Sequence, residues 1–89
     1  MNSNRNWVLQ IDDSVFKFLS RIQRQDGERI LRAIQDLPND PFRGDIQKMK
    51  GEVNIWRRRI GAYRFRFELF SDERVIHVFL TERRGSKSY

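Results

Sequence analysis

The sequence predicts an α+β fold with the element order β-α-α-β-β-β, in which a two-helix hairpin packs on one face of an antiparallel sheet. Three observations predict it. Apolar residues recur with helical spacing in two stretches of the first half. Polar and apolar residues alternate with the period of a strand in the second half. The length of 89 residues suits one small domain covering residues 1–89.

The N-terminal stretch contains the signals for one strand and one helix. Residues 7–11 (WVLQI) form a short apolar run that is typical of a strand. Three residues that can N-cap a helix come next: Asp12, Asp13 and Ser14. The apolar stripe of the first helix comprises Val15, Phe16, Phe18, Leu19 and Ile22. Residues 25–27 (QDG) then break the helical pattern.

A second helix is expected from about Glu28 to Leu37. It ends before Pro38, because the residue that precedes a proline avoids the helical conformation. Residues 38–51 contain two prolines and two glycines and are expected to form a loop, with one short turn around residues 46–49. Strands are expected at residues 53–60, 63–70 and 75–82. Their short connections predict an antiparallel meander.

Alternation along residues 63–70 predicts the two faces of the sheet. Tyr63, Phe65, Phe67 and Leu69 share the face that the helices should cover. In the last strand, the residues expected in the core are Ile76, Val78 and Leu80. The opposite, open face is then expected to carry Arg57, Arg59, Arg64, Arg66 and Arg83. Arg58 should point toward the helices near an edge, with its stem packed and its guanidinium in water.

Composition and net charge limit the classes of function that the chain can have. The formal net charge is +6, and a dense arginine cluster is typical of a surface that meets a polyanion, either a nucleic acid or an acidic protein. The chain has no cysteine and one histidine, so no metal site or small-molecule cofactor is predicted. No apolar run reaches the roughly 18 residues that cross a bilayer, and the first residues lack the apolar core of a signal peptide. No membrane association is expected, and the expected location is the cytoplasm.

The second half of the chain contains an arginine-bearing strand, the Gly61-Ala62-Tyr63-Arg64 sequence, and a last strand that leads to Arg83 and a C-terminal Tyr89. With these features and its element order, the chain resembles the RelE/ParE superfamily of type II toxins over nearly its whole length, most strongly from Gly51 to Tyr89. RelE-like proteins are metal-independent endoribonucleases that cut mRNA, commonly in the ribosomal A site. The resemblance therefore implies a cognate antitoxin as protein partner, with mRNA and ribosomal RNA as targets. The alternatives are a ParE-like inhibitor of DNA gyrase and a nonenzymatic RNA-binding module.

The resemblance also implies site residues. Arg64, Arg83 and Tyr89 match the arginines and the tyrosine of RelE-like toxins, and Arg59 stands with the basic residues of the preceding strand. These four are the predicted catalytic residues. The predicted RNA-binding residues are Arg57, Arg66, Arg84 and Lys87.

RNA cleavage by the 2′-hydroxyl requires a base, an acid and cations that stabilise the phosphorane. Tyr89 is one candidate base, or it stacks on a nucleobase instead. Glu68 is a second candidate, although an ion pair with Arg66 or Arg57 is the simpler expectation for it. His77 is a third candidate, with a structural role as its alternative.

Overall fold

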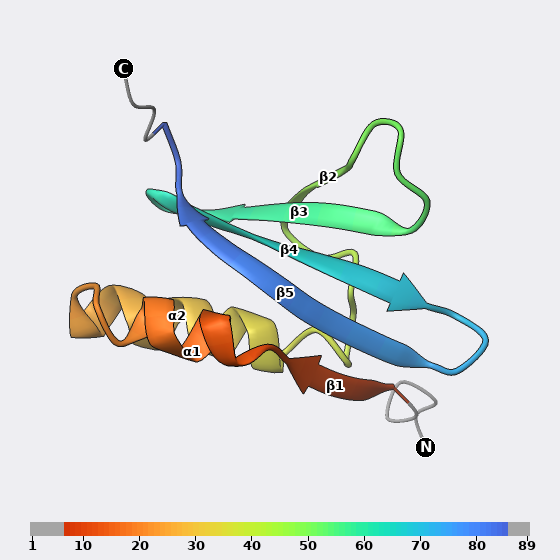
Figure 1. Cartoon of the computed structure of the whole chain (residues 1–89), viewed down its shortest axis with the longest axis horizontal. Helices are drawn as coiled ribbons and strands as arrows, with labels where there is room; N and C mark the ends of the chain where they lie inside the picture. Colours follow the sequence, from red (N-terminus) through yellow and green to blue (C-terminus); the bar gives the residue numbers. More distant parts are fainter. Residues whose placement is uncertain (1–6, 86–89) are drawn as a thin grey trace.

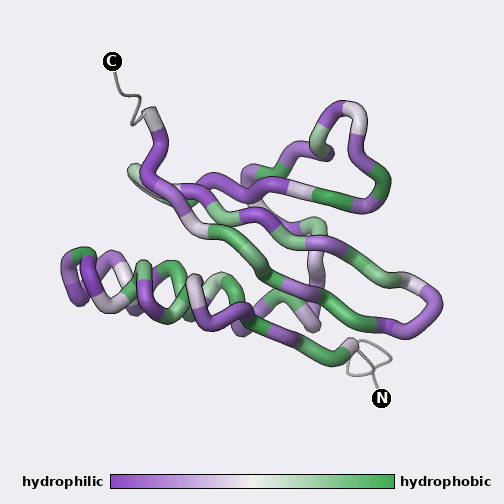
Figure 2. The backbone as a smooth tube through the Cα atoms, viewed as in Figure 1, coloured by the Kyte–Doolittle hydropathy of each residue, from purple (hydrophilic) through white to green (hydrophobic). Residues whose placement is uncertain are grey.

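The alternation of β4 (Tyr63–Phe70) places the hydrophobic core on one face of the sheet. In the structure, a computed structural model that describes residues 7–85, every second residue of β4 is buried. These residues pack against apolar side chains of the two helices and of the strand beside β4. The core comprises Val15, Ile30, Ile34, Leu37, Tyr63, Phe65, Phe67, Leu69, Ile76 and Val78. The same alternation of hydrophilic and hydrophobic residues is visible along the strands in Figure 2.

Five strands form one sheet, in the order β1-β5-β4-β3-β2. β3 (Ile55–Ile60), β4 and β5 (Val75–Arg83) form the predicted antiparallel meander, whereas β1 (Val8–Ile11) joins β5 in parallel. The helices α1 (Asp13–Leu19) and α2 (Arg24–Gln35) lie side by side against the sheet (Figure 1). The predicted α+β class and two-helix layer are thus confirmed. Neither described helix is long and apolar enough to span a bilayer.

The helix boundaries differ from the prediction. The first helix ends at Leu19, where the Ser20 hydroxyl donates a hydrogen bond of 2.7 Å to the Lys17 carbonyl. The second begins at Arg24, so residues 25–27 are helical and do not form a break. Gly27 is buried, and a Cβ added there would lie 3.1 Å from the Leu19 carbonyl oxygen. The glycine therefore lets the two helices approach closely, which explains its place inside a helix.

The turn predicted at residues 46–49 is wrong, because β2 (Asp45–Lys48) is a strand. It pairs antiparallel with β3, with Asp45 opposite Arg59 and Gln47 opposite Arg57. Four mostly polar residues give no recognisable strand pattern in the sequence. The backbone hydrogen bonds to β3, the next strand along the chain, decide the conformation of this segment.

A β-bulge interrupts the pairing of β4 with β5. Arg66 lies opposite Leu80, whereas the next residue, Phe67, lies opposite Val78, so Phe79 is an extra residue on β5. One extra residue reverses the alternation of the strand beyond it. The first half of β5 therefore follows the predicted faces, and the second half does not.

The predicted faces of Leu80 and Arg83 are wrong for this reason. Leu80 lies opposite Arg66 on the open face, and Thr81 is buried opposite Phe65. Arg83 lies opposite Tyr63, on the face that the helices cover. Glu82 lies on the open face, opposite Arg64. Unbroken alternation would have placed its neighbours Thr81 and Arg83 on that face instead.

Candidate nucleic-acid interface

Four arginines of β3 and β4 form two directly opposed pairs on the open face. Arg57 lies opposite Arg66, and Arg59 lies opposite Arg64. Opposed residues of an antiparallel pair have Cβ atoms about 5 Å apart, and like charges at this spacing destabilise a sheet. The predicted common face of these four residues is confirmed. We call Arg57, Arg59, Arg64 and Arg66 the arginine cluster.

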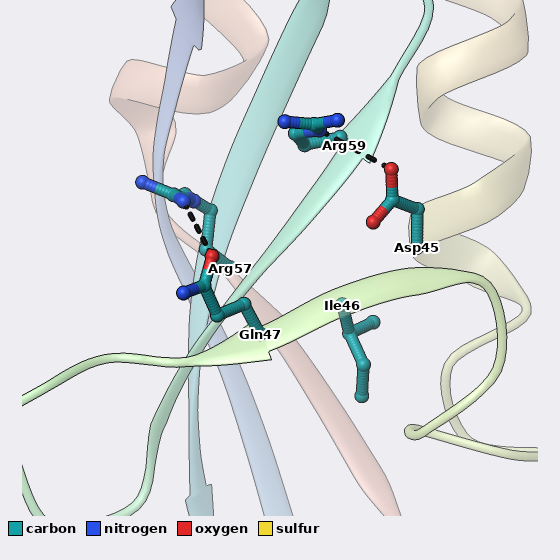
Figure 3. A pocket seen from close by; sticks show the side chains of 5 residues that line it. All are labelled: Asp45, Ile46, Gln47, Arg57 and Arg59. Atoms are coloured by element: carbon teal, nitrogen blue, oxygen red, sulfur yellow. Dashed lines mark hydrogen bonds and ion pairs between the residues drawn. The ribbon is translucent and has the colours of Figure 1, made fainter.

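The edge strand β2 supplies polar partners to one half of the cluster. The Nη2 of Arg57 donates to Gln47 Oε1 at 2.7 Å, and the Nε of Arg59 lies 3.2 Å from Asp45 Oδ2. Figure 3 shows both guanidiniums held by side chains that rise from β2, while Ile46 points away from them. These residues line a hollow of about 190 Å³. The missed strand therefore belongs to the candidate site.

The carboxylate of Glu82, on β5, binds the other half of the arginine cluster, Arg64 and Arg66. Glu82 Oε2 accepts a hydrogen bond of 2.7 Å from Arg64 Nε and lies 3.5 Å from Arg66 Nη2. The side chain of Arg64 is 26% exposed, and those of Arg66 and Glu82 are each 31% exposed. Water therefore screens these ion pairs only partly. The sequence offers no signal for Glu82, since the bulge that turns it onto this face is not visible there.

The cluster retains positive charge and contains two buried donors without a partner within residues 7–85. Its four guanidiniums face two paired carboxylates, those of Asp45 and Glu82. The Nε atoms of Arg57 and Arg66 are buried and have no hydrogen-bond partner among the described residues. A buried donor without a partner loses its hydration free energy. The excess of guanidiniums over carboxylates suits an oxyanion such as a phosphate.

Neither protein-family models nor curated proteins match the sequence. Solved structures do match. A chain of the archaeal RelE-RelB complex from Pyrococcus horikoshii OT3 superposes with a TM-score of 0.78 at 23% identity, over 92% of this chain and 99% of that chain. The RelB-RelE complex from Methanococcus jannaschii gives 0.70 at 26% identity, over 86% and 92% of the two chains. The YoeB/ParE toxin from Agrobacterium tumefaciens gives 0.69 at 21% identity, over 86% and 98%.

The chain has the RelE/ParE toxin fold. The likeness extends over most of its length in each comparison, so it includes the sheet that carries the arginine cluster. The fold that the resemblance implied is therefore confirmed. The roles predicted for individual residues stay predictions.

Within this RelE/ParE fold, Arg83 and Arg84 do not join the cluster. Arg83 Nη1 donates to the Tyr63 hydroxyl at 3.3 Å, and its guanidinium lies 5.5 Å from the centre of the Tyr63 ring. Arg84 Nη1 donates to the Gly61 carbonyl at 2.9 Å, at the β3–β4 turn. Lys87 and Tyr89 lie outside the described residues.

Two of the candidate bases lie beside the cluster. Glu68 lies opposite His77 on β5, two positions along β4 from Arg66. The ion pair predicted between Glu68 and Arg66 or Arg57 is wrong: Arg66 pairs with Glu82, and Arg57 bonds Gln47. Among residues 7–85, no group of three or more histidines, cysteines or acids is placed to hold a metal ion.

Arg58 lies on the helix-covered face, as predicted. It is opposite Phe65 and Ile46, and its guanidinium packs against Gly44. The side chain is half-buried, and its Nε is buried without a hydrogen-bond partner in the described part of the chain, so the expectation that the guanidinium is in water is wrong for this atom. Burial lowers the pKa of Arg58, and the nearby charge of Asp36 opposes that effect. Arg58 is therefore set apart from the arginine cluster by both position and environment.

Proposed function

We propose that the protein is the toxin of a toxin–antitoxin pair and acts as a metal-independent endoribonuclease on ribosome-bound mRNA. The observation that carries the proposal is the arginine cluster on the open face of a RelE/ParE-type sheet. Guanidiniums bind phosphate oxygens in a bidentate manner and stay charged at any working pH. A rigid sheet holds them in place before the substrate arrives, which is what electrostatic stabilisation of a transition state requires.

The chemistry follows from the position of the guanidiniums. The RNA phosphate binds between those of Arg57 and Arg66, which lie opposite each other on the open face. The adjacent 2′-oxygen loses its proton to a base and attacks phosphorus. The bond from phosphorus to the 5′-oxygen breaks, and that oxygen takes up a proton. The guanidiniums stabilise the charge that grows on the phosphorane oxygens.

The base remains one of three residues: Tyr89, Glu68 or His77. Glu68 and His77 lie opposite each other on the open face. Arg83 lies at the far end of β5 on the other face, so in this proposal it binds RNA backbone as the chain leads toward Tyr89. Arg84 and Lys87 extend the same basic segment, which suits contacts with RNA phosphates.

The protein partner in this proposal is an antitoxin with an acidic segment. RelE occurs with RelB in the Pyrococcus horikoshii and Methanococcus jannaschii structures. An acidic segment that becomes ordered over the arginine cluster would complete its charge and block RNA. The same surface would then serve both substrate and inhibitor.

The test is brief expression in cells followed by mapping of mRNA 5′ ends. We expect cuts in register with codons for the wild type, and their loss in the Arg57→Ala/Arg66→Ala variant. The matched control is Arg21→Ala/Arg32→Ala, which removes the same charge from exposed positions in the helical layer. Intact message with the wild-type protein, or undiminished cutting by the cluster variant, would overturn the proposal.

A gyrase inhibitor is the second candidate function, and one observation favours it. Glu82 binds Arg64 and Arg66 and so presents a negative charge where an RNA phosphate would lie. A noncatalytic protein that binds gyrase has no need of a free phosphate site. Expression that causes DNA damage while messages remain intact would identify this function.

A further inference from the structure

An aromatic pair lies beside the arginine cluster on the open face. The ring centroids of His77 and Phe79 are 6.0 Å apart, with an angle of 42° between the ring planes. Both side chains are partly exposed. His77 lies opposite Glu68, which follows Arg66 by two residues on β4. Aromatic rings and guanidiniums therefore adjoin on the same surface.

The β-bulge makes this apolar surface wider. Phe79 is the extra residue, and Leu80, immediately after it, lies opposite Arg66 on the open face. The ring contact with His77 keeps Phe79 on that face as well. Two successive apolar residues thus project beside an arginine whose Nε has no partner in the described chain. Bulges commonly redirect side chains in this way next to binding sites.

We propose that His77 and Phe79 form a stacking surface for one unpaired nucleobase of a single-stranded RNA. The phosphate that adjoins this base is the one held by Arg57 and Arg66, so the inference rests on the proposed function and adds a base contact to it. Proteins that bind single strands combine a basic track with aromatic rings, because every base has a stacking face. In a duplex the bases are already stacked, so the ligand is single-stranded.

Binding to two oligonucleotides tests the inference. The first is a 2′-O-methyl oligoribonucleotide, which lacks the attacking hydroxyl and is not cut by the proposed reaction. The second has the same length and charge but carries an abasic residue at successive positions in turn. We expect the wild-type protein to bind the abasic ligand roughly tenfold more weakly at one position, the size of a lost stacking contact.

The variants separate stacking from phosphate binding. Phe79→Ala should bind the complete ligand about tenfold more weakly and should lose the preference over the abasic one, with an unchanged dependence on salt. Phe79→Tyr keeps a ring and should bind like the wild type. Phe16→Ala, which shortens an exposed aromatic residue of α1, is the matched control and should have no effect.

The outcomes distinguish the inference from the function on which it rests. Equal wild-type affinity for complete and abasic ligands would overturn the stacking surface while leaving phosphate binding intact. The stacking surface would also be overturned if Phe79→Ala bound the complete ligand as tightly as the wild type does. That result is expected if the two rings contact a protein partner instead of a nucleobase. Failure of the wild type to bind either ligand would overturn RNA binding itself.

Discussion

Arg64 donates a hydrogen bond of 2.7 Å from its Nε to the carboxylate of Glu82, across the β4–β5 pair. The same carboxylate oxygen lies 3.5 Å from Arg66. One anion of the chain therefore neutralises part of the arginine cluster in the absence of any ligand. Glu82 holds the two guanidiniums in place, and it also competes with a phosphate for them.

Replacement of Glu82 should therefore strengthen RNA binding. The change Glu82→Gln keeps the side-chain length and an acceptor oxygen but removes the charge, so we expect about two- to fivefold tighter binding at low salt, the range for one partly exposed ion pair. The measurement is titration of the 2′-O-methyl oligoribonucleotide at two salt concentrations. Glu73→Gln, at an exposed position of the β4–β5 turn, is the charge-matched control. If Glu82→Gln bound RNA more weakly than the wild type, the role of Glu82 in positioning the arginines would outweigh its competition with the RNA phosphate.

Arg64 and Arg83 should act by different routes, because they lie on opposite faces of the sheet. We expect the double change Arg64→Ala/Arg83→Ala to abolish growth inhibition with the fold intact. Of the single variants, Arg64→Ala should weaken RNA binding. Arg83→Ala should also lower the free energy of unfolding by about 0.5–1 kcal/mol through loss of its contact with the Tyr63 ring. Urea unfolding and circular dichroism check stability and fold, and full toxicity of the double variant would contradict the site.

Arg58 should be replaceable at no cost in stability. Its Nε is buried without a hydrogen-bond partner in the described chain, and burial lowers its pKa. Removing such a cation in favour of an apolar side chain of similar length is often neutral or stabilising. We expect Arg58→Met to match or exceed the wild-type free energy of unfolding in urea.

The contrasting variant for this site is Gly44→Ala. Its added Cβ would lie 2.7 Å from Arg58 Nε, at a residue whose φ is +91°. We expect it to be destabilising, because a non-glycine residue is strained at this φ. A loss of more than about 1 kcal/mol in Arg58→Met would show instead that the guanidinium stabilises the residue 38–44 loop.

The stabilising contribution of the Asp12 cap at the N-terminus of α1 should decrease in acid. The Ser14 hydroxyl and then the Ser14 backbone N–H donate to Asp12 and hold its pKa below the ordinary value, with smaller help from His77. A lowered folded-state pKa gives stability that is present above the unfolded-state pKa and is lost as pH falls through the folded-state pKa. This window lies below about pH 4.

Asp12→Asn provides the reference for that prediction, because asparagine also N-caps helices but does not titrate. We expect the wild type to be the more stable of the two at pH 7, and this advantage to shrink as the pH falls toward 3. Urea unfolding of both proteins across this range measures the difference. A difference that does not change with pH would show that the charged Asp12 contributes nothing beyond its role as a cap.

Local patterns predicted the elements in which one face is buried. The alternation of Tyr63, Phe65 and Phe67 identified β4 and its faces, because a strand with one buried face keeps a period of two. It also grouped the four arginines of the cluster. Patterns failed where contacts between elements decide the structure. β2 is a strand because its backbone pairs with β3, and Gly27 lies inside α2 where this helix comes close to the Leu19 carbonyl.

The amino-acid sequence by itself determined the α+β class, the core face of β4 and the presence of a basic surface. Tertiary structure decided which residues complete that surface. The bulge at Phe79 moves Glu82 onto the open face and Arg83 away from it. The physical reason is that the bulge is a property of the pairing between β4 and β5, while the period of two that predicts faces assumes unbroken pairing.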